Sequence, residues 1–213
     1  MPPRIRISAA ETTIESDAAF DADMAAQFAA HNAIELRDLF APDVQAMFAR
    51  LWHEVRFVPD DIAIEGSRLR ETPARSGPLL CWLLNRPALR NWLERVTGVT
   101  PLAAVWGATA QFQAGGGQQL DWHNDVRDAR RRLGVTVNLG TVPYDGGRFE
   151  MKRHGSEALL LQYEHAQWGT ALVFRIDERL MHRVTPVTAG GPRTVFGGWF
   201  LSERIARATK PAR

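Results

Sequence analysis

The chain has 213 residues, of which 45% are hydrophobic and 23% are charged, and its formal net charge is +2. This balance is typical of a folded globular protein, excludes a disordered chain, and gives no sign of a nucleic-acid partner. There is no signal-peptide core and no run of about 18 apolar residues, so we expect a cytoplasmic protein with no membrane partner. The single cysteine, Cys81, excludes an intrachain disulfide and a cysteine-based zinc cluster. Any bound metal must therefore be held by nitrogen and oxygen atoms.

Residues 1–213 are expected to form one domain, since domains commonly run to about 100–200 residues. The first twenty or so residues are polar and are predicted to be loosely held, although the IRIS stretch favours a short edge strand. Residues 22–54 have a helical pattern. Apolar residues recur there at i, i+3, i+4, i+7 and i+8, after Pro42 as a helix starter: Val44, Met47, Phe48, Leu51 and Trp52.

Residues 57–78 are rich in proline, glycine, arginine and acids, and are predicted to be a long irregular connection. Such a connection is either a lid over a site or a disordered surface loop. A second helical region over residues 78–98 is interrupted at Pro87 and ends at Gly98. Residues from about 22 to 100 are thus predicted to be a mainly helical support.

The pattern changes after Pro101, where about eight short strand-like runs are separated by glycine-rich turns. Many short strands with such turns are typical of a sandwich or barrel. We therefore predict an α+β fold, with a double-stranded β-helix (jelly-roll) core over about residues 101–204 and packing helices before it.

One candidate metal site begins in the stretch DWHND, which contains His123 and Asp125. In a strand, side chains at i and i+2 point to the same face, so both can reach one ion. Alone, this pair is equally compatible with an ordinary polar turn. His182 in a later strand-like run would complete two histidines and one carboxylate, a set that suits non-haem Fe(II) and leaves three coordination sites open. Arg193, eleven residues later, is placed to bind a carboxylate with two parallel hydrogen bonds.

These motifs, H-x-D followed by H-R-V-x-P-V-x-x-G-x-x-R, resemble the Fe(II)/2-oxoglutarate-dependent dioxygenases, in particular their prolyl 4-hydroxylase-like branch. Weaker likenesses are RRLGVTVNLG and YDGGRFEM, and the resemblance covers roughly residues 100–203. It implies metal ligands at His123, Asp125 and His182, and a 2-oxoglutarate anchor at Arg193. It also implies Fe(II) as cofactor, 2-oxoglutarate and dioxygen as cosubstrates, and ascorbate as an optional stimulant.

The chain departs from the family pattern near the cosubstrate. Asn138 stands where related hydroxylases often have a tyrosine, and Val195 stands where a serine is common. We expect Asn138 and Gln113 to contact cosubstrate beside Arg193. The presence of Asp125 disfavours the halogenase variant, and Trp199 stands where demethylases of the AlkB type have a second arginine.

The resemblance implies an oxygenase that hydroxylates an unactivated carbon and releases succinate and CO2. The expected substrate is an amino acid, a peptide residue or a small polar metabolite, bound as a small molecule or short peptide. Two alternatives are a catalytically inactive jelly-roll module and a cupin-like metal-binding protein, which would not need Arg193. The oligomeric state is not indicated.

Several other residues were assigned by type and position. The arginines of residues 127–132 form either a solvated loop or a contact for a substrate carboxylate. Large aromatic residues are predicted to fill the core: Trp122, Trp168, Trp199 and Phe200. His154 and His165 are not expected to be metal ligands, because neither has an arginine at the correct distance along the chain.

Overall fold

The computed structural model describes residues 4–62, 65–165 and 167–204. The first half of the chain alternates strands with helices: β1 (Ile5–Ile7), β2 (Thr12–Ile14), α1 (Ala18–His31), β3 (Ala33–Leu36), α2 (Pro42–Leu51), β4 (Arg56–Ile62), β5 (Gly66–Thr72), α3 (Ser76–Leu84) and α4 (Pro87–Thr97). The second half is all strand: β6 (Ala104–Phe112), β7 (Gln119–His123), β8 (Arg131–Asn138), β9 (Tyr144–Gly146), β10 (Phe149–Arg153), β11 (Leu159–Tyr163), β12 (Ala171–Arg175), β13 (Leu180–Val184), β14 (Val187–Gly190) and β15 (Arg193–Leu201).

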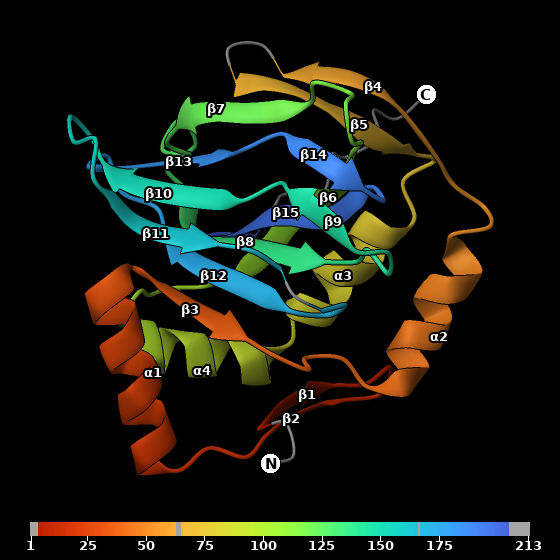
Figure 1. The fold of residues 1–213 in the computed structure, drawn as a ribbon. Helices are drawn as coiled ribbons and strands as arrows, with labels where there is room; N and C mark the ends of the chain where they lie inside the picture. The colour runs from red at the N-terminus through yellow and green to blue at the C-terminus, as the bar shows by residue number, and fades with distance from the viewer. Residues whose placement is uncertain (1–3, 63–64, 166, 205–213) are drawn as a thin grey trace, which may run out of the picture.

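Most strands join one curled antiparallel sheet in the order β11-β10-β13-β7-β5-β6-β15-β8-β12-β3, with β4 paired to β5. β9 and β14 form a separate two-stranded sheet beside it, and β1 pairs with β2. Figure 1 shows the curled sheet with α3 and α4 behind and below the strands. The predicted α+β jelly-roll fold with packing helices is confirmed.

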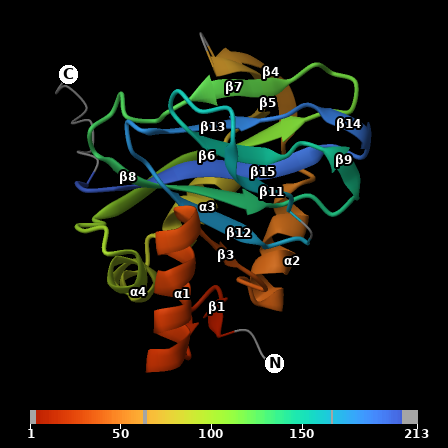
Figure 2. The ribbon, with the colours of Figure 1, turned by 60° about the vertical axis from the view of Figure 1, so that its left-hand side comes forward.

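The hydrophobic core lies between the helices and the outer face of the sheet. Side chains of β15 alternate, so that Phe196 and Phe200 are fully buried in the core that also contains Phe28, Phe48 and Trp92. Residues at the intervening positions of β15 point to the other face, into the curl of the sheet. Figure 2 shows α1 and α4 packed side by side below the strands. The helices thus support the strand that carries Arg193 at its first position.

Two segments differ from the sequence-based expectation. The predicted irregular connection over residues 57–78 is largely the hairpin of β4 and β5, which pairs with β6 and β7; residues 63–64 at its turn lie outside the described residues. The prediction was wrong because this hairpin is rich in charged residues, as edge strands often are, and lacks an apolar alternation. Residues 33–36, within the predicted helical stretch, form β3 at the sheet edge. Asn32, with φ of 56°, ends α1 just before it.

The N-terminal residues are better anchored than predicted. The IRIS stretch contributes β1, as expected, but Ile5 and Ile7 are buried in the core, with relative exposures of 5% and 0%. Helix α4 begins at Pro87 and ends at Thr97, and the next residue, Gly98, has a φ of 66° that suits a left-handed C-cap. Within the described part of the chain, no helix has the length and apolar character needed to cross a membrane.

Candidate metal centre

Strands β7 and β13 bring His123 and His182 opposite one another as antiparallel partners. The centroids of the two imidazole rings lie 4.3 Å apart. Asp125 follows β7 by two residues, and its Oδ2 atom lies 3.3 Å from Nε2 of His182. One ligand atom from each of the three residues lies within 4.8 Å of the other two. Two positions far apart in the sequence therefore converge at one point that can hold a metal ion.

The histidine rings are held in orientations that suit metal binding. Nδ1 of His123 lies 2.7 Å from the backbone carbonyl of Asp121, so this nitrogen donates its N–H and leaves Nε2 with a free lone pair. His182 is buried, with the rings of Phe149 and Phe174 at centroid distances of 5.5 and 4.9 Å. The apolar wall fixes the ring and limits the access of water.

The charges at the centre also suit a divalent cation. Burial lowers the pKa of His182 below its ordinary value, so the ring is neutral near pH 7 and can act as a ligand. Burial alone would raise the pKa of Asp125, but hydrogen bonds from His182 and Trp199 lower it to about 2. An ionised carboxylate beside two imidazoles is a fitting donor set for Fe(II).

The second notable group is Arg193, which is 1% exposed and lies 5.2 Å from the ring centroid of Phe112. Its Nε and Nη1 atoms are buried and have no hydrogen-bond partner among the residues that the structure describes, and the same holds for the hydroxyl of Tyr144. Burial lowers the pKa of Arg193. Burial also raises the pKa of Tyr144, and the positive charge of Arg193 reduces that rise. Buried unpaired donors are costly, so this arrangement fits an anionic ligand that would satisfy them.

A cavity of about 440 Å³ connects the three candidate metal ligands with Arg193. His123, Asp125 and His182 lie along it, as do Arg193 and, toward its rim, charged and aromatic side chains: Glu65, Arg68, Trp106, Arg127 and Arg131. Gly197 also borders it, and a Cβ added there would meet no atom within 4 Å. The volume lies within the range of small-molecule sites, about 300–1,000 Å³.

The two other predicted cosubstrate contacts, Gln113 and Asn138, do not line the cavity and stay predictions. Gln113 is exposed, and its side chain lies 3.5 Å from that of Gln111, outside the cavity lining. Asn138 is buried, but its amide donates to the carbonyl of Gln167 and accepts from the backbone N–H of Gly140. Both polar ends of the Asn138 amide are thereby engaged by the backbone.

Two of the predicted core aromatic residues have other roles. Trp122 is half-buried on the outside of the curl, with Lys152 and Arg183 each 4.7 Å from its ring centroid. Trp199 lines the cavity, while Phe200 and Trp168 pack in or against the core as predicted. The parity of the strands explains the difference: Trp122 points opposite to His123, and Trp199 shares a face with Arg193.

The two histidines that were not expected to bind metal lie outside the triad. His154 is exposed just after β10. His165 is buried between Thr136 and Thr170, with ring nitrogens 3.2 and 3.1 Å from the two hydroxyls.

The sequence does not predict two contacts of the site, that of Tyr144 with the Arg193 region and that of Arg131 with Asp125. Tyr144 begins β9, and nothing in the sequence shows that β9 lies near Arg193. Gly147 follows this strand, and a Cβ there would lie 2.6 Å from Cδ of Arg193. Arg131 was seen only as part of an arginine run, yet its Nη1 atom donates to Oδ1 of Asp125 at 2.7 Å.

Comparison with known proteins agrees with this geometry. Residues 108–201 match the model of the 2OG-Fe(II) oxygenase superfamily. No curated protein matches the chain.

Several solved structures have a similar fold. A 2OG-Fe(II) oxygenase family oxidoreductase from Burkholderia pseudomallei is 19% identical with a TM-score of 0.62, over 86% of this chain and 91% of that one. A prolyl-4-hydroxylase from Pseudomonas putida is 20% identical with a TM-score of 0.60, over 86% and 100%. The α-ketoglutarate-dependent epimerase SnoN of nogalamycin biosynthesis is 14% identical with a TM-score of 0.60, over 92% and 94%.

Proposed function

We propose that this oxygenase uses His123, Asp125 and His182 to hold Fe(II), and hydroxylates an unactivated carbon of a small polar metabolite, an amino acid or a short peptide. The observation that carries the proposal is the pairing of an open three-ligand metal centre with the unpartnered, buried guanidinium of Arg193 in one cavity. A cupin-like metal protein has no need of that guanidinium.

The protein contributes ligation, orientation and exclusion of water. His123, His182 and Asp125 would hold the ion through two imidazoles and one carboxylate, a donor set that would leave coordination positions free for reactants. When bound, ferrous iron and 2-oxoglutarate supply the oxidising chemistry with dioxygen, and succinate and CO2 are released. Phe149 and Phe174 beside His182 keep that side of the centre apolar.

Arg193 would bind the distal carboxylate of 2-oxoglutarate with two parallel hydrogen bonds. Tyr144, from the separate β9 turn, would donate a third hydrogen bond to the same carboxylate, since its hydroxyl is buried and unpartnered in the described structure. Related hydroxylases often have a tyrosine at the position of Asn138. Tyr144 would take over the role of that tyrosine. The three donors together would satisfy the buried polar atoms.

The rim of the cavity supports a small polar substrate or a short peptide. Arg127 pairs with Glu65 at 3.2 Å, and Arg68 pairs with Asp60 at 2.9 Å, so both signs of charge are present near the opening. A substrate that carries an amine and a carboxylate would find a partner of the opposite charge in each of these partly buried pairs.

The test begins with binding of Fe(II) and 2-oxoglutarate under anaerobic conditions, followed by succinate formation after oxygen is admitted. Free amino acids, short peptides and small polar acids are then screened for the gain of one oxygen atom by mass spectrometry. His182→Ala should abolish succinate formation, whereas His154→Ala, outside the centre, should not. Absence of 2-oxoglutarate binding to the iron-loaded wild type would refute the proposal, and product without added oxygen would refute the hydroxylation step.

A further inference from the structure

The two carboxylate oxygens of Asp125 have different environments. Oδ2 faces Nε2 of His182 at 3.3 Å, on the side of the metal centre. Oδ1 accepts a hydrogen bond of 2.7 Å from Nη1 of Arg131, which also lies 3.5 Å from the Asp125 backbone carbonyl. Asp125 is 5% exposed, so water has little access to its carboxylate and does not readily replace these partners. One oxygen is thus already engaged, and the other is left for a metal.

The guanidinium of Arg131 is itself held in place by stacking. Its Cζ atom lies 3.7 Å from the ring centroid of Trp199. Trp199 in turn stacks on Trp106, with the two ring centroids 5.4 Å apart at an interplanar angle of 13°. A planar guanidinium on an aromatic ring keeps a defined direction, which an ammonium group would not.

The backbone explains why Arg131 alone, of its arginine run, reaches the metal centre. Where β15 pairs with β8, the register shifts between Phe200 and Leu201, so that Arg131 pairs with Leu201 and Arg132 is skipped. Such a bulge redirects side chains. Arg132 points to the carbonyl of Thr100 at 3.3 Å, and Arg130 pairs with Asp128 at 2.8 Å.

We propose that Arg131, stacked on Trp199, is a positioning residue that reserves Oδ1 of Asp125, so that this carboxylate binds the metal through Oδ2 alone. The inference rests on the proposed metal centre. A carboxylate free to turn can take two metal positions, and the cosubstrate would then have to displace one of its oxygens. The ring of Trp199 carries the guanidinium of Arg131 and also stacks on Trp106.

The test uses Co(II), which occupies such a centre without turnover, and compares Arg131→Lys with Arg132→Lys. Both variants keep the net charge, so the long-range attraction or repulsion of ions is unchanged, but only the first removes the stacked, directed donor from Asp125. The measurements are the Kd of Co(II) by calorimetry, the Kd of 2-oxoglutarate for the Co(II)-loaded protein, and the visible absorption of bound Co(II), which reports its coordination.

For Arg131→Lys we expect both dissociation constants to rise about 10-fold to 100-fold, as for other partners that orient metal ligands, with a changed Co(II) spectrum. Arg132→Lys should match the wild type in all three measurements. Equal constants and spectra for the two variants would overturn the inference while leaving the metal centre intact. A wild type that binds neither Co(II) nor Fe(II) would overturn both.

A second variant guards against a loss of folding in the first. Trp199→Leu keeps Arg131 but removes both its platform and the indole N–H that lowers the pKa of Asp125, so it should weaken Co(II) and 2-oxoglutarate binding in the same direction. In the double variant the two effects should not add, because both act through the orientation of Asp125. Additive effects, with both single variants folded by circular dichroism, would contradict the proposal.

Discussion

Asp125 and His182 are separated by 56 intervening residues, yet Oδ2 of the first lies 3.3 Å from Nε2 of the second. A metal that binds the folded protein and not the unfolded chain stabilises it by mass action, by about 2.7 kcal/mol at 100 times its Kd. For a chain of this size that corresponds to a rise in Tm of about 5–10 °C. We expect this rise when Co(II) is added to the wild type, and its reversal by a chelator.

Asp125→Ala should lose this thermal shift, because the carboxylate is the only charged member of the triad. His154→Ala should keep it, since that exposed ring lies away from the centre. Each variant is compared with itself, with and without metal, so a change in the stability of the metal-free variant does not affect the outcome. A full shift in Asp125→Ala would rule out this carboxylate as a ligand.

Arg193→Met should make the protein more stable and at the same time weaken the binding of 2-oxoglutarate. The buried guanidinium has unpartnered donors, so replacing it with an apolar side chain of similar length should raise the free energy of unfolding by about 1–3 kcal/mol. The same change should weaken 2-oxoglutarate binding by at least about 100-fold, since two charge-assisted hydrogen bonds are lost. Urea unfolding and calorimetry give the two values. A less stable variant with normal 2-oxoglutarate affinity would contradict the anchor role.

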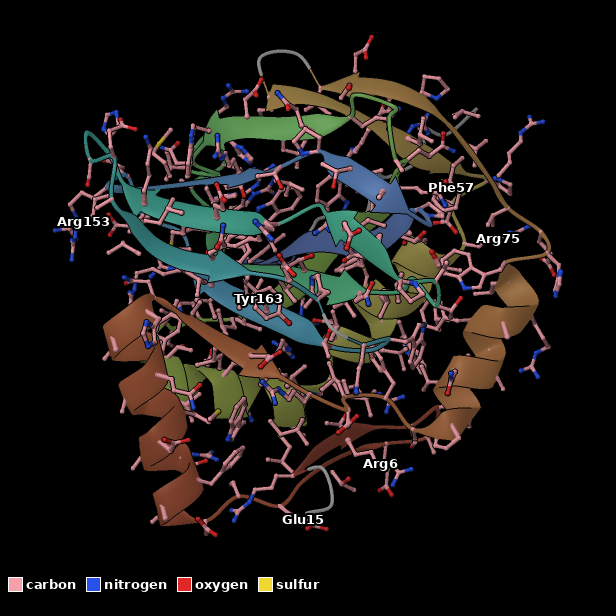
Figure 3. The ribbon with its side chains drawn as sticks, viewed as in Figure 1. Arg6, Glu15, Phe57, Arg75, Arg153 and Tyr163 are labelled. Carbon is pink, nitrogen blue, oxygen red and sulfur yellow. The ribbon has the colours of Figure 1, made fainter. Side chains whose placement is uncertain are left out.

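The two tyrosines of the chain form a matched pair for testing the second anchor. Tyr144→Phe should raise the Kd of 2-oxoglutarate about tenfold with little loss of stability, because its hydroxyl has no partner in the described structure. The Tyr163 hydroxyl instead donates to Glu35 at 3.1 Å, joining β11 to β3; Figure 3 shows this side chain between those strands. Tyr163→Phe should lower stability by about 1 kcal/mol and leave 2-oxoglutarate affinity unchanged. The opposite pattern would assign the cosubstrate contact to Tyr163.

The sequence was sufficient to predict the jelly-roll class and the convergence of His123, Asp125 and His182. Strand parity places His123 and Asp125 on one face, which is a local property of the chain, and the resemblance to a known family adds His182. Tyr144 and Arg131 could not be predicted in the same way. The first reaches Arg193 through a separate two-stranded sheet, and the second depends on a register shift between β8 and β15. Both are long-range features of the backbone that leave no periodic signal.

The place of Asn138 in a motif predicts a cosubstrate contact, which stays a prediction; in the structure its amide is hydrogen-bonded to the backbone of Gln167 and Gly140. The predicted irregular connection is wrong where β4 and β5 form a hairpin, because the buried positions of this hairpin are few; Leu69 and Glu71 are the buried residues of β5. Polar edge hairpins are recognised by their pairing and not by an apolar pattern.

Gly197 and Gly198 are adjacent in β15 and should respond differently to the addition of a methyl group. At Gly197 a Cβ meets nothing within 4 Å, whereas at Gly198 it would lie 2.7 Å from the carbonyl oxygen of Trp106. Gly197→Ala should therefore raise the free energy of unfolding by about 0.4–1 kcal/mol through a less flexible unfolded chain. Gly198→Ala should lower it by about 1–3 kcal/mol through overpacking. Equal effects in urea unfolding would mean that the cavity beside Gly197 is filled by protein.

The free energy of unfolding of the metal-free protein should fall as the pH drops below neutral, because of the buried ring of His165. Burial, followed by the charge of Arg193, lowers the pKa of His165 well below its ordinary value of 6.5. The folded protein therefore leaves this ring neutral, while the unfolded chain binds a proton below about pH 6.5. The stabilising contribution is full above that pH and is lost as the pH falls through it. From pH 7.5 to 5.5 the loss is about 1.4 kcal/mol for one such group.

His165→Gln keeps a donor and an acceptor between Thr136 and Thr170 but does not titrate. The decline in unfolding free energy between these two pH values, measured with urea in the presence of a chelator, should be smaller by about 1.4 kcal/mol in this variant than in the wild type. His154→Gln, at an exposed position, should keep the wild-type decline. Carboxylates that titrate over the same range are common to all three proteins and cancel in the comparison. An unchanged decline in His165→Gln would mean that His165 accepts a proton in the folded state, despite its two hydroxyl partners and the nearby guanidinium.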